Sequence, residues 1–312
     1  MISLGIDTSN YTTSCALFDS DANIIIQKKK LLPVKAGERG LRQSDAVFHH
    51  TQQLYPLIDE LMKEYPHSVD IIGVSEKPRD VEGSYMPCFT VGINTAHSIS
   101  SVISKPLYNF SHQSGHIMAA LWSCGKLDLI NKNFIAFHIS GGTTEALYIS
   151  PDKDRIFKAE IIGKTLDLNC GQVIDRAGVM FGMHFPCGKE LEKSALLSKE
   201  RYNPKVSVKD GNCSLSGLEN LCKKMIDNNE KSEDVAAFCI QFISKTIEKM
   251  ALHAIDTVGN LPIVFAGGVM SDKIIRNNLE NKFNAYFAEP DFSCDNAAGT
   301  ALLAFYRGMN NG

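Results

Sequence analysis

Two stretches of this 312-residue chain decide its fold, because they repeat one pattern. The first reads Leu4-Gly-Ile-Asp-Thr-Ser-Asn-Tyr-Thr-Thr-Ser-Cys-Ala-Leu-Phe18, and the second reads Ile135-Ala-Phe-His-Ile-Ser-Gly-Gly-Thr-Thr-Glu-Ala-Leu-Tyr-Ile149. Each places an apolar run, a small polar turn, two threonines and a second apolar run in the same order. This order is typical of a β-hairpin. The chain is therefore expected to contain two similar hairpins.

The distance between these hairpins indicates a duplicated domain. They lie about 130 residues apart, far above the periods of about 20–50 residues that repeat arrays use. A further strand is expected after each hairpin, over residues 23–30 and 156–162. A chance likeness between two ordinary hairpins is the alternative, and duplication is the favoured interpretation.

Helical patterns follow both hairpins, interrupted by few strand signals. Pro56 is expected to kink or break the first helix. Short strands are expected at residues 263–266 and 286–287. The mixture predicts an α/β protein with two similar lobes, residues 1–105 and 106–312. The expected helices cover residues 46–63, 90–103, 111–122, 171–180, 189–197, 215–226, 233–258, 271–279 and 296–307.

Composition excludes several classes of protein. A chain that is 44% hydrophobic and 21% charged is neither disordered nor fibrous. Its net charge of −3 argues against binding nucleic acid by bulk charge, although a local basic patch stays open. Nine cysteines without a C-x-x-C pair, and no secretory signal, predict reduced thiols in the cytoplasm. No apolar window of about 20 residues occurs, so no membrane association is expected.

A pair of histidines suggests a metal site. His112 and His116 lie four positions apart in an expected helix, which places both imidazoles on one face. Gln113 stands where a zinc protease has its general base, so that activity is disfavoured. His138 and Asp295 are candidates for further ligands, and such a set suits iron or zinc. Two ordinary surface histidines are the alternative.

Glycine-rich turns mark candidate phosphate sites. Ser140-Gly141-Gly142 lies between two expected strands, and Gly267-Gly268 lies between a strand and a helix. Glycines allow a backbone to approach a phosphate closely, and turned N–H groups form an anion site. Ordinary tight turns explain either segment equally well by itself. Because the G-x-G-x-x-G pattern is absent, a dinucleotide-binding fold is disfavoured.

Acidic residues near a third turn complete the candidate set. Asp175 precedes the Pro186-Cys187-Gly188 turn, and Glu192 follows it by one helical turn. Carboxylates bind ribose hydroxyls by accepting their hydrogen bonds. A solvated helix face is the alternative for such isolated acids.

Together, the motifs resemble one family. Gly-Ile-Asp-Thr-Ser, His-x-x-x-His, Ser-Gly-Gly-x-Thr, Asp followed by Pro-x-Gly, Leu-Ser-Gly-Leu, Ala-Gly-Gly-Val and Asp-Asn occur in this order over residues 4–299. Each motif is weak alone, but the ordered set is specific. The chain resembles the TsaD (Gcp/YgjD-like) family, the tRNA threonylcarbamoyladenosine transferases, as a divergent paralogue.

The resemblance implies a fold, a reaction and a set of site residues. The fold is the duplicated actin/hexokinase-like (ASKHA) fold with a nucleotide cleft between its lobes. The reaction moves threonylcarbamoyl from threonylcarbamoyl-AMP to N6 of an adenine in the tRNA anticodon loop. One divalent metal, iron or zinc, and an adenine nucleotide are implied as cofactors, and tRNA and further subunits of a threonylcarbamoylation complex as partners. The implied metal ligands are His112, His116 and Asp295, with His138 as a further candidate, and the implied nucleotide residues are His138, Ile139, Ser140, Gly141, Gly142, Asp175, Gly188, Glu192, Gly267, Gly268 and Asp272.

Some positions depart from the family pattern. Thr143 replaces a histidine, Gln172 replaces a glutamate, and Asp272 stands where asparagine is usual. The first turn has lost two acids, and residues 75–87 replace a short Gly-Pro-Gly loop. A transferase with another acceptor and a non-catalytic nucleotide-binding scaffold are therefore alternatives, while the retained metal set favours catalysis. A small-molecule kinase is disfavoured, because no kinase-like catalytic Asp can be identified.

Overall fold

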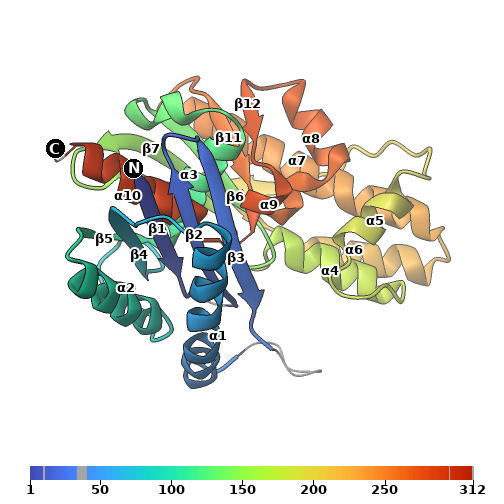
Figure 1. Ribbon diagram of the computed structural model, residues 1–312. Helices are drawn as coiled ribbons and strands as arrows, with labels where there is room; N and C mark the ends of the chain where they lie inside the picture. Colours follow the sequence, from blue (N-terminus) through green and yellow to red (C-terminus); the bar gives the residue numbers. More distant parts are fainter. Residues whose placement is uncertain (10, 34–40, 295, 311–312) are drawn as a thin grey trace. The chain divides into compact units, whose positions relative to one another are not determined.

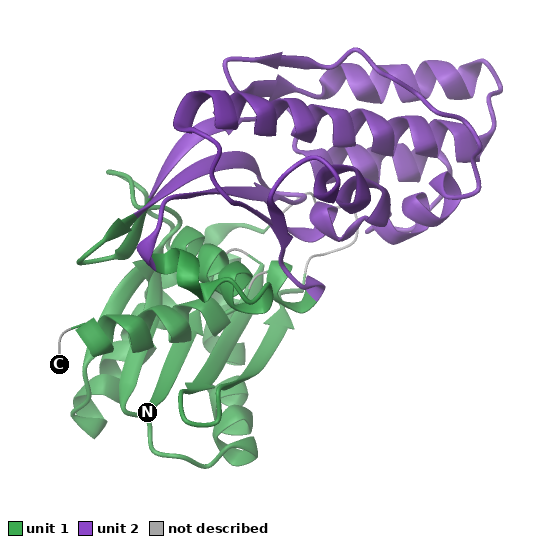
Figure 2. Ribbon diagram, turned by 90° about the horizontal axis from the view of Figure 1, so that it is seen from above, with its two compact units in different colours: residues 1–130, 151–158, 291–312 green, residues 131–150, 159–290 purple. Residues whose placement is uncertain are grey.

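The chain folds into two compact units, each built around a five-stranded sheet (Figure 2). A computed structural model describes residues 1–9, 11–33, 41–294 and 296–310. Unit 1 comprises residues 1–130, 151–158 and 291–312, and unit 2 comprises residues 131–150 and 159–290. The predicted lobes 1–105 and 106–312 follow different bounds, and that division stays a prediction.

The sheet of unit 1 has the strand order β3-β2-β1-β4-β5 (Figure 1). β1 pairs antiparallel with β2 and parallel with β4, so a hairpin and parallel crossover strands share one sheet. The hairpin appears where the sequence predicts it, but β4 and β5 were not expected. The strands are β1 (Ile2–Asp7), β2 (Thr12–Asp19), β3 (Ile24–Leu31), β4 (Ile71–Lys77) and β5 (Leu107–Ser111).

Helices cover both faces of this sheet. α1 (Gln43–Glu64) and α2 (Phe89–Ile103) pack on the face to which Leu4 and Ile6 contribute. On the other face α10 (Ala298–Asn310) lies against β1 and β4, and α3 (His112–Ser123) lies against α10. Two short elements lie at the boundaries of unit 1 in the sequence, the 3₁₀ turn η1 (Leu127–Asn131) and the helix α9 (Pro290–Ser293).

Small residues allow α10 to approach the sheet and α3. A Cβ atom on Gly5 would lie 2.4 Å from the carbonyl oxygen of Ala297, and one on Gly299 would lie 1.8 Å from that of Gly115. No side chain fits in either gap. These contacts explain why the last helix belongs to unit 1.

Pro56 lies inside α1 without breaking it. The predicted break is therefore wrong. Pro56 is on the exposed side of the helix, where water can bond to the backbone carbonyl that lacks a helical donor.

The sheet of unit 2 repeats the order of unit 1, as β12-β11-β6-β7-β8. β6 and β7 form the second predicted hairpin, and β11 pairs parallel with both β6 and β12. This repetition confirms the predicted α/β class. The strands are β6 (Phe134–Ile139), β7 (Thr144–Asp152), β8 (Ile156–Lys164), β11 (Ile263–Ala266) and β12 (Ala285–Phe287), with a separate pair β9 (Ser207–Lys209) and β10 (Asn212–Ser214).

In unit 2 the shorter helices α4, α5, α6 and α8 pack against the long helix α7. α7 (Ser232–Val258) contributes much of the core, together with residues from the sheet and the shorter helices. The expected helices all occur, with small differences at their ends. The shorter ones are α4 (Cys170–Met180), α5 (Gly188–Ala195), α6 (Ser216–Asp227), the 3₁₀ turn η2 (Gly268–Ser271) and α8 (Lys273–Glu280). No helix in the described part of the chain is both long and apolar enough to cross a membrane.

Candidate functional site

The first turn of α3 brings the two predicted histidines together in unit 1. The Nε2 atoms of His112 and His116 lie 2.9 Å apart, and their rings are nearly perpendicular. His116 is buried, and the side chain of His112 is 17% exposed. The spacing predicted from the sequence therefore produces a convergent pair of ring nitrogens.

Asp7, at the end of β1, fixes the orientation of His112. Its Oδ2 atom lies 2.8 Å from Nδ1 of His112 and accepts a hydrogen bond of 2.6 Å from Ser75. The backbone N–H of Ser9 donates to Oδ1 at 2.8 Å. Burial alone would raise the pKa of Asp7, but His112, Ser75 and Ser9 together hold that pKa below its usual value. Asp7 is therefore a carboxylate, and Nδ1 of His112 carries the proton.

This arrangement matches the donor set of a transition-metal site. A carboxylate that binds Nδ1–H makes Nε2 the nitrogen that can act as a ligand, as in carboxylate–histidine–metal groups, and here Nε2 of His112 lies beside Nε2 of His116. Two nitrogens that share a tetrahedral zinc ion stand about 3.3 Å apart, close to the separation seen here. The histidine pair therefore fits a zinc or iron ion.

The remaining predicted ligands are not brought to this pair by the described residues. Asp295 lies outside the described residues, and His138 is on β6 in unit 2. Within the described part of the chain, no group of three or more His, Cys, Asp or Glu side chains could hold a metal ion. The four-residue metal set stays a prediction beyond His112 and His116.

Loop 75–87 is anchored beside His112. Ser111, the N-cap of α3, donates to Asp80 at 2.9 Å, and Ser114 donates to the same carboxylate at 3.1 Å. The backbone N–H of Gln113 bonds to the carbonyl of Pro78 at 3.0 Å. Lys77 pairs with Glu76 and Asp80. The loop that departs from the family pattern is thus fastened to the turn that carries the first histidine.

In unit 2, the turn between β6 and β7 is open. The Ser140 hydroxyl accepts hydrogen bonds from the N–H groups of Gly142 and Thr143, and so closes the turn. A Cβ atom on Gly141 or Gly142 would meet nothing within 4 Å. Space above this backbone is therefore available to a ligand.

The N-terminal end of α4 meets the same turn. Gly171 donates its N–H to the carbonyl of Ser140, and a Cβ atom on Gly171 would lie 2.6 Å from the nitrogen of Gly141. Thr144 accepts a bond from the N–H of Cys170. The positive end of a helix dipole therefore lies beside the glycine turn, which favours an anion there.

Gly267 has a structural reason to be glycine. Its φ of +101° is unfavourable for other residues, and a Cβ atom would lie 2.2 Å from the carbonyl oxygen of Ile139. Gly268 has no such neighbour within 4 Å. Close packing against β6 therefore requires a glycine at position 267, whereas Gly268 faces open space.

The predicted acidic residues hold turns and helix ends. Asp175 accepts the N–H of Cys187, next to Gly188, and burial raises its pKa. Glu192 accepts the N–H of Lys273 at 3.0 Å. Asp272 caps α8, and its pKa is raised to about 6 by burial, with the charge of Glu192 adding to the effect. The bond to Cys187 places Asp175 beside Gly188. The bond between Glu192 and Lys273 joins the helices α5 and α8.

Sequence reasoning missed two residues that matter to this site. Asp7 and Ser75 were not in the candidate set, yet they position His112. A signal existed for Asp7, because it is an acid that ends an otherwise apolar run. Ser75 carried none, because β4 itself was not expected.

Comparison with known proteins decides the family. The sequence model of TsaD, described as tRNA N6-adenosine threonylcarbamoyltransferase, matches residues 22–302. The chain belongs to the TsaD family. This match confirms the family and the acyltransferase class predicted from the sequence.

Relatives with this family's name cover almost the whole chain. The tRNA N6-adenosine threonylcarbamoyltransferase of Thermosipho melanesiensis is 28% identical, over 98% of this chain and 94% of its own. A probable bifunctional tRNA threonylcarbamoyladenosine biosynthesis protein of Thermoplasma acidophilum is 25% identical over 99% of this chain. The chain spans 57% of the length of that bifunctional relative.

Solved structures agree with the fold. A ROK family glucokinase from Streptomyces griseus superimposes with a TM-score of 0.56 at 9% identity, covering 98% of this chain and 100% of the glucokinase. At such low identity the likeness concerns the fold alone. It confirms the actin/hexokinase-like fold predicted from the sequence.

Proposed function

We propose that this TsaD family member transfers a threonylcarbamoyl group from threonylcarbamoyl-AMP to N6 of an adenine in the tRNA anticodon loop. The new bond joins N6 to the carbamoyl carbon, the bond from that carbon to the phosphate oxygen breaks, and AMP leaves as N6 loses a proton. The observation that carries the proposal is the Asp7–His112–His116 arrangement, which a scaffold would not need.

His112 and His116 would hold the metal, with Asp295 and His138 as the other predicted ligands. An iron or zinc ion there would act as a Lewis acid and a template for the acyl donor. The contribution of the chain itself is orientation, because Asp7 would keep the proton on Nδ1 of His112 and make Nε2 the ligand atom beside His116. No nucleophilic side chain is needed, since the attacking amine belongs to the acceptor.

The adenylate would lie on unit 2. Its phosphate would contact the backbone of residues 138–142 beside the start of α4, where N–H groups and the helix dipole favour an anion. Gly267 and Gly268 would border the base, and Asp175, Gly188, Glu192 and Asp272 would surround the ribose and base. A cytoplasmic location belongs to the same proposal.

Mass spectrometry of tRNA nucleosides tests the reaction. We expect this chain to restore threonylcarbamoyladenosine in a strain that lacks its own transferase, and we expect His112→Ala/His116→Ala to fail. His97→Ala is the matched control, because His97 is exposed on α2. If the wild-type chain restores nothing while adenine nucleotides bind, the non-catalytic alternative replaces this proposal.

Metal content is measured on the same proteins. Elemental analysis should find about one iron or zinc per wild-type chain and His97→Ala chain, and much less in the double histidine variant. Equal metal content in all three would remove the histidine pair from the proposed site.

Loop 75–87 offers a test of the acceptor, because it is bonded to α3 beside His112. If Arg79 contacts tRNA, Arg79→Ala weakens tRNA binding and lowers the salt dependence by about one phosphate contact. If the acceptor is a different molecule, tRNA binding stays unchanged while transfer to that molecule falls.

A further inference from the structure

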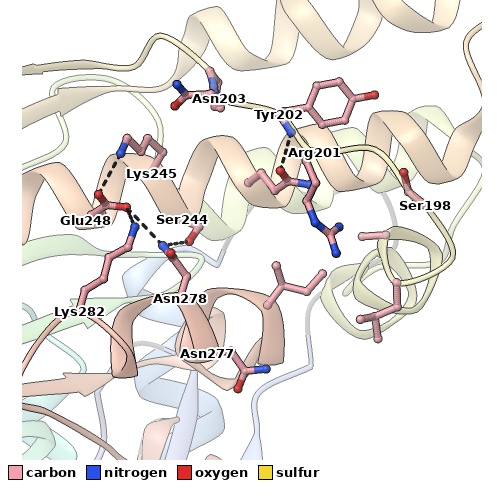
Figure 3. Close-up of a pocket in the computed structure, with 15 residues that line it drawn as sticks. Ser198, Arg201, Tyr202, Asn203, Ser244, Lys245, Glu248, Asn277, Asn278 and Lys282 are labelled. Carbon is pink, nitrogen blue, oxygen red and sulfur yellow. Dashed lines mark hydrogen bonds and ion pairs between the residues drawn. The ribbon is translucent and has the colours of Figure 1, made fainter.

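A further pocket lies in unit 2, and its lining includes none of the residues assigned to the adenylate, although Ile274 in its wall bonds to Asp272. Its volume is about 450 Å³, and its walls come from the end of α5, residues 198–204, α7 and α8 (Figure 3). None of the predicted metal or nucleotide residues lines it. The volume is in the range of small-molecule sites, roughly 300–1,000 Å³.

One wall holds two lysines in fixed positions. Glu248 on α7 is buried, and its carboxylate bonds to Lys245 at 2.9 Å and to Lys282 after α8. Asn278 reaches both Ser244 and Glu248. Burial would raise the pKa of Glu248, but the lysines and Asn278 lower it, so the carboxylate is charged. The two ammonium groups are therefore held at the pocket wall.

Arg201 and Asn277 add further donors to the lining of the pocket. Arg201 points from the loop towards the side of the pocket formed by α8 (Figure 3). Its guanidinium has one hydrogen bond within the described residues, at 3.4 Å to the carbonyl of Glu200. The side chain of Asn277 makes no hydrogen bond within the described residues. Arg201 uses one of its five N–H groups for Glu200, so both side chains have donors left for a ligand.

The charge of the lining indicates the class of ligand. Arg201, Lys245 and Lys282 contribute three positive charges, and Glu248 contributes the single negative charge, which leaves +2. A guanidinium binds phosphate through two parallel hydrogen bonds, and lysines add charge. Leu196, Pro204 and Ile274 supply apolar contact for a carbon skeleton.

We propose that this pocket binds a small phosphate monoester, whose dianionic head lies between Arg201 and the Lys245–Lys282 wall. A small molecule is favoured over a phosphate of RNA, because the hollow has a volume of about 450 Å³ and a buried carboxylate lies at its wall. That carboxylate would repel an extended polyanion. The proposal is independent of the transferase activity, since it uses none of the residues assigned to that reaction.

Calorimetry with ribose 5-phosphate tests the site, with ribose as the neutral control. We expect saturable binding of the phosphate ester and none of ribose. Arg201→Gln should weaken binding at least tenfold, and Asn277→Asp should weaken it by a similar factor through added negative charge. Lys205→Gln removes an exposed charge from the same segment outside the pocket, and should change binding less than twofold.

Gly141→Ala separates this pocket from the proposed adenylate site. Binding of ribose 5-phosphate should be unchanged in Gly141→Ala, because Gly141 does not line the pocket. Loss of binding in Gly141→Ala with retention in Arg201→Gln would overturn the proposal. So would a lack of saturable binding in the wild type, or weaker tRNA binding by Arg201→Gln together with no ribose 5-phosphate binding.

Discussion

The β1–β2 turn and the β6–β7 turn occupy equivalent places in sheets of the same strand order, but they are built differently. In unit 1, Asp7, Thr8 and Ser9 at this turn are buried and engaged in side-chain bonds: Asp7 binds Ser75 and His112, and Thr8 bonds to Cys88 and Gly92. In unit 2 the turn is closed by Ser140 and leaves Gly141 and Gly142 exposed. One copy thus positions a side chain, and the other offers its backbone.

This difference suggests how a duplicated fold divides its tasks. Hydrogen bonds among buried groups fix His112, the proposed metal ligand, and they fill the space that a ligand would need. Exposed glycines do the reverse, because they leave N–H groups and room. The predictions below test this division from the largest expected effect to the smallest.

The largest effect is expected at Gly267. Gly267→Ala places a Cβ atom against the Ile139 carbonyl and forces an unfavourable φ, so it should cost about 3 kcal/mol or more of unfolding free energy. Gly268→Ala is the matched control and should stay within about 0.5 kcal/mol. Urea unfolding measures both, and equal stability of the two variants would contradict the packing argument.

A second test breaks the buried network of the first turn. Asp7→Asn replaces a charged acceptor of three hydrogen bonds, so it should lower the unfolding free energy by about 2–3 kcal/mol. Metal content should fall with it, because His112 loses its orienting partner. Asp21→Asn, on an exposed carboxylate, is the control. Full metal content in Asp7→Asn would show that His112 needs no such partner.

A third test concerns Asp272, the carboxylate that caps α8 in unit 2. The pKa of Asp272 is raised from 3.8 to about 6, so between pH 4 and 6 the folded chain binds more protons than the unfolded chain. Wild-type stability attributable to this group therefore falls as pH rises through that window. Asp272→Asn keeps the helix cap and should be more stable at pH 7 by about 1–2 kcal/mol.

The pH dependence supplies the control for that prediction. The difference between Asp272→Asn and the wild type should shrink towards pH 4, where the wild-type carboxyl is protonated. Asp256→Asn, on the exposed side of α7, should show no such trend. A constant difference at every pH would mean that the carboxyl is not the cause.

The smallest effect on stability is expected at Gly141. Gly141→Ala meets no neighbour within 4 Å, so unfolding should change by less than about 0.5 kcal/mol. Calorimetry should nevertheless show weaker AMP binding, because the added methyl group occupies the space proposed for the phosphate. Unchanged AMP affinity would place the nucleotide elsewhere.

Local patterns predicted much of this fold, and long-range contacts explain what they missed. Both hairpins and the helices were predictable, because apolar runs on either side of a small polar turn and helical periodicity are visible in neighbouring residues. β4 was missed because no turn motif or neighbouring hairpin strand marks it, and its parallel pairing with β1 is not visible locally. The effect of Pro56 was misjudged because exposure depends on where α1 lies.

The site shows the same limit. The spacing of His112 and His116 sufficed to predict their convergence, since both lie on one helix. Asp7 reaches His112 across more than 100 residues, and no local pattern links them. The role of Gly267 was likewise hidden, because it depends on the carbonyl of Ile139.

The place of α10 has a consequence for the order of folding during synthesis. Unit 1 begins with the first strands but needs α10, which leaves the ribosome after every other described element. Until then the glycine-lined face of β1 and β4 is uncovered, while the residues of unit 2 have already emerged. Unit 2 is therefore expected to mature first on the ribosome, and a nascent chain stalled before residue 291 would be a natural client for chaperones that shield apolar sheets.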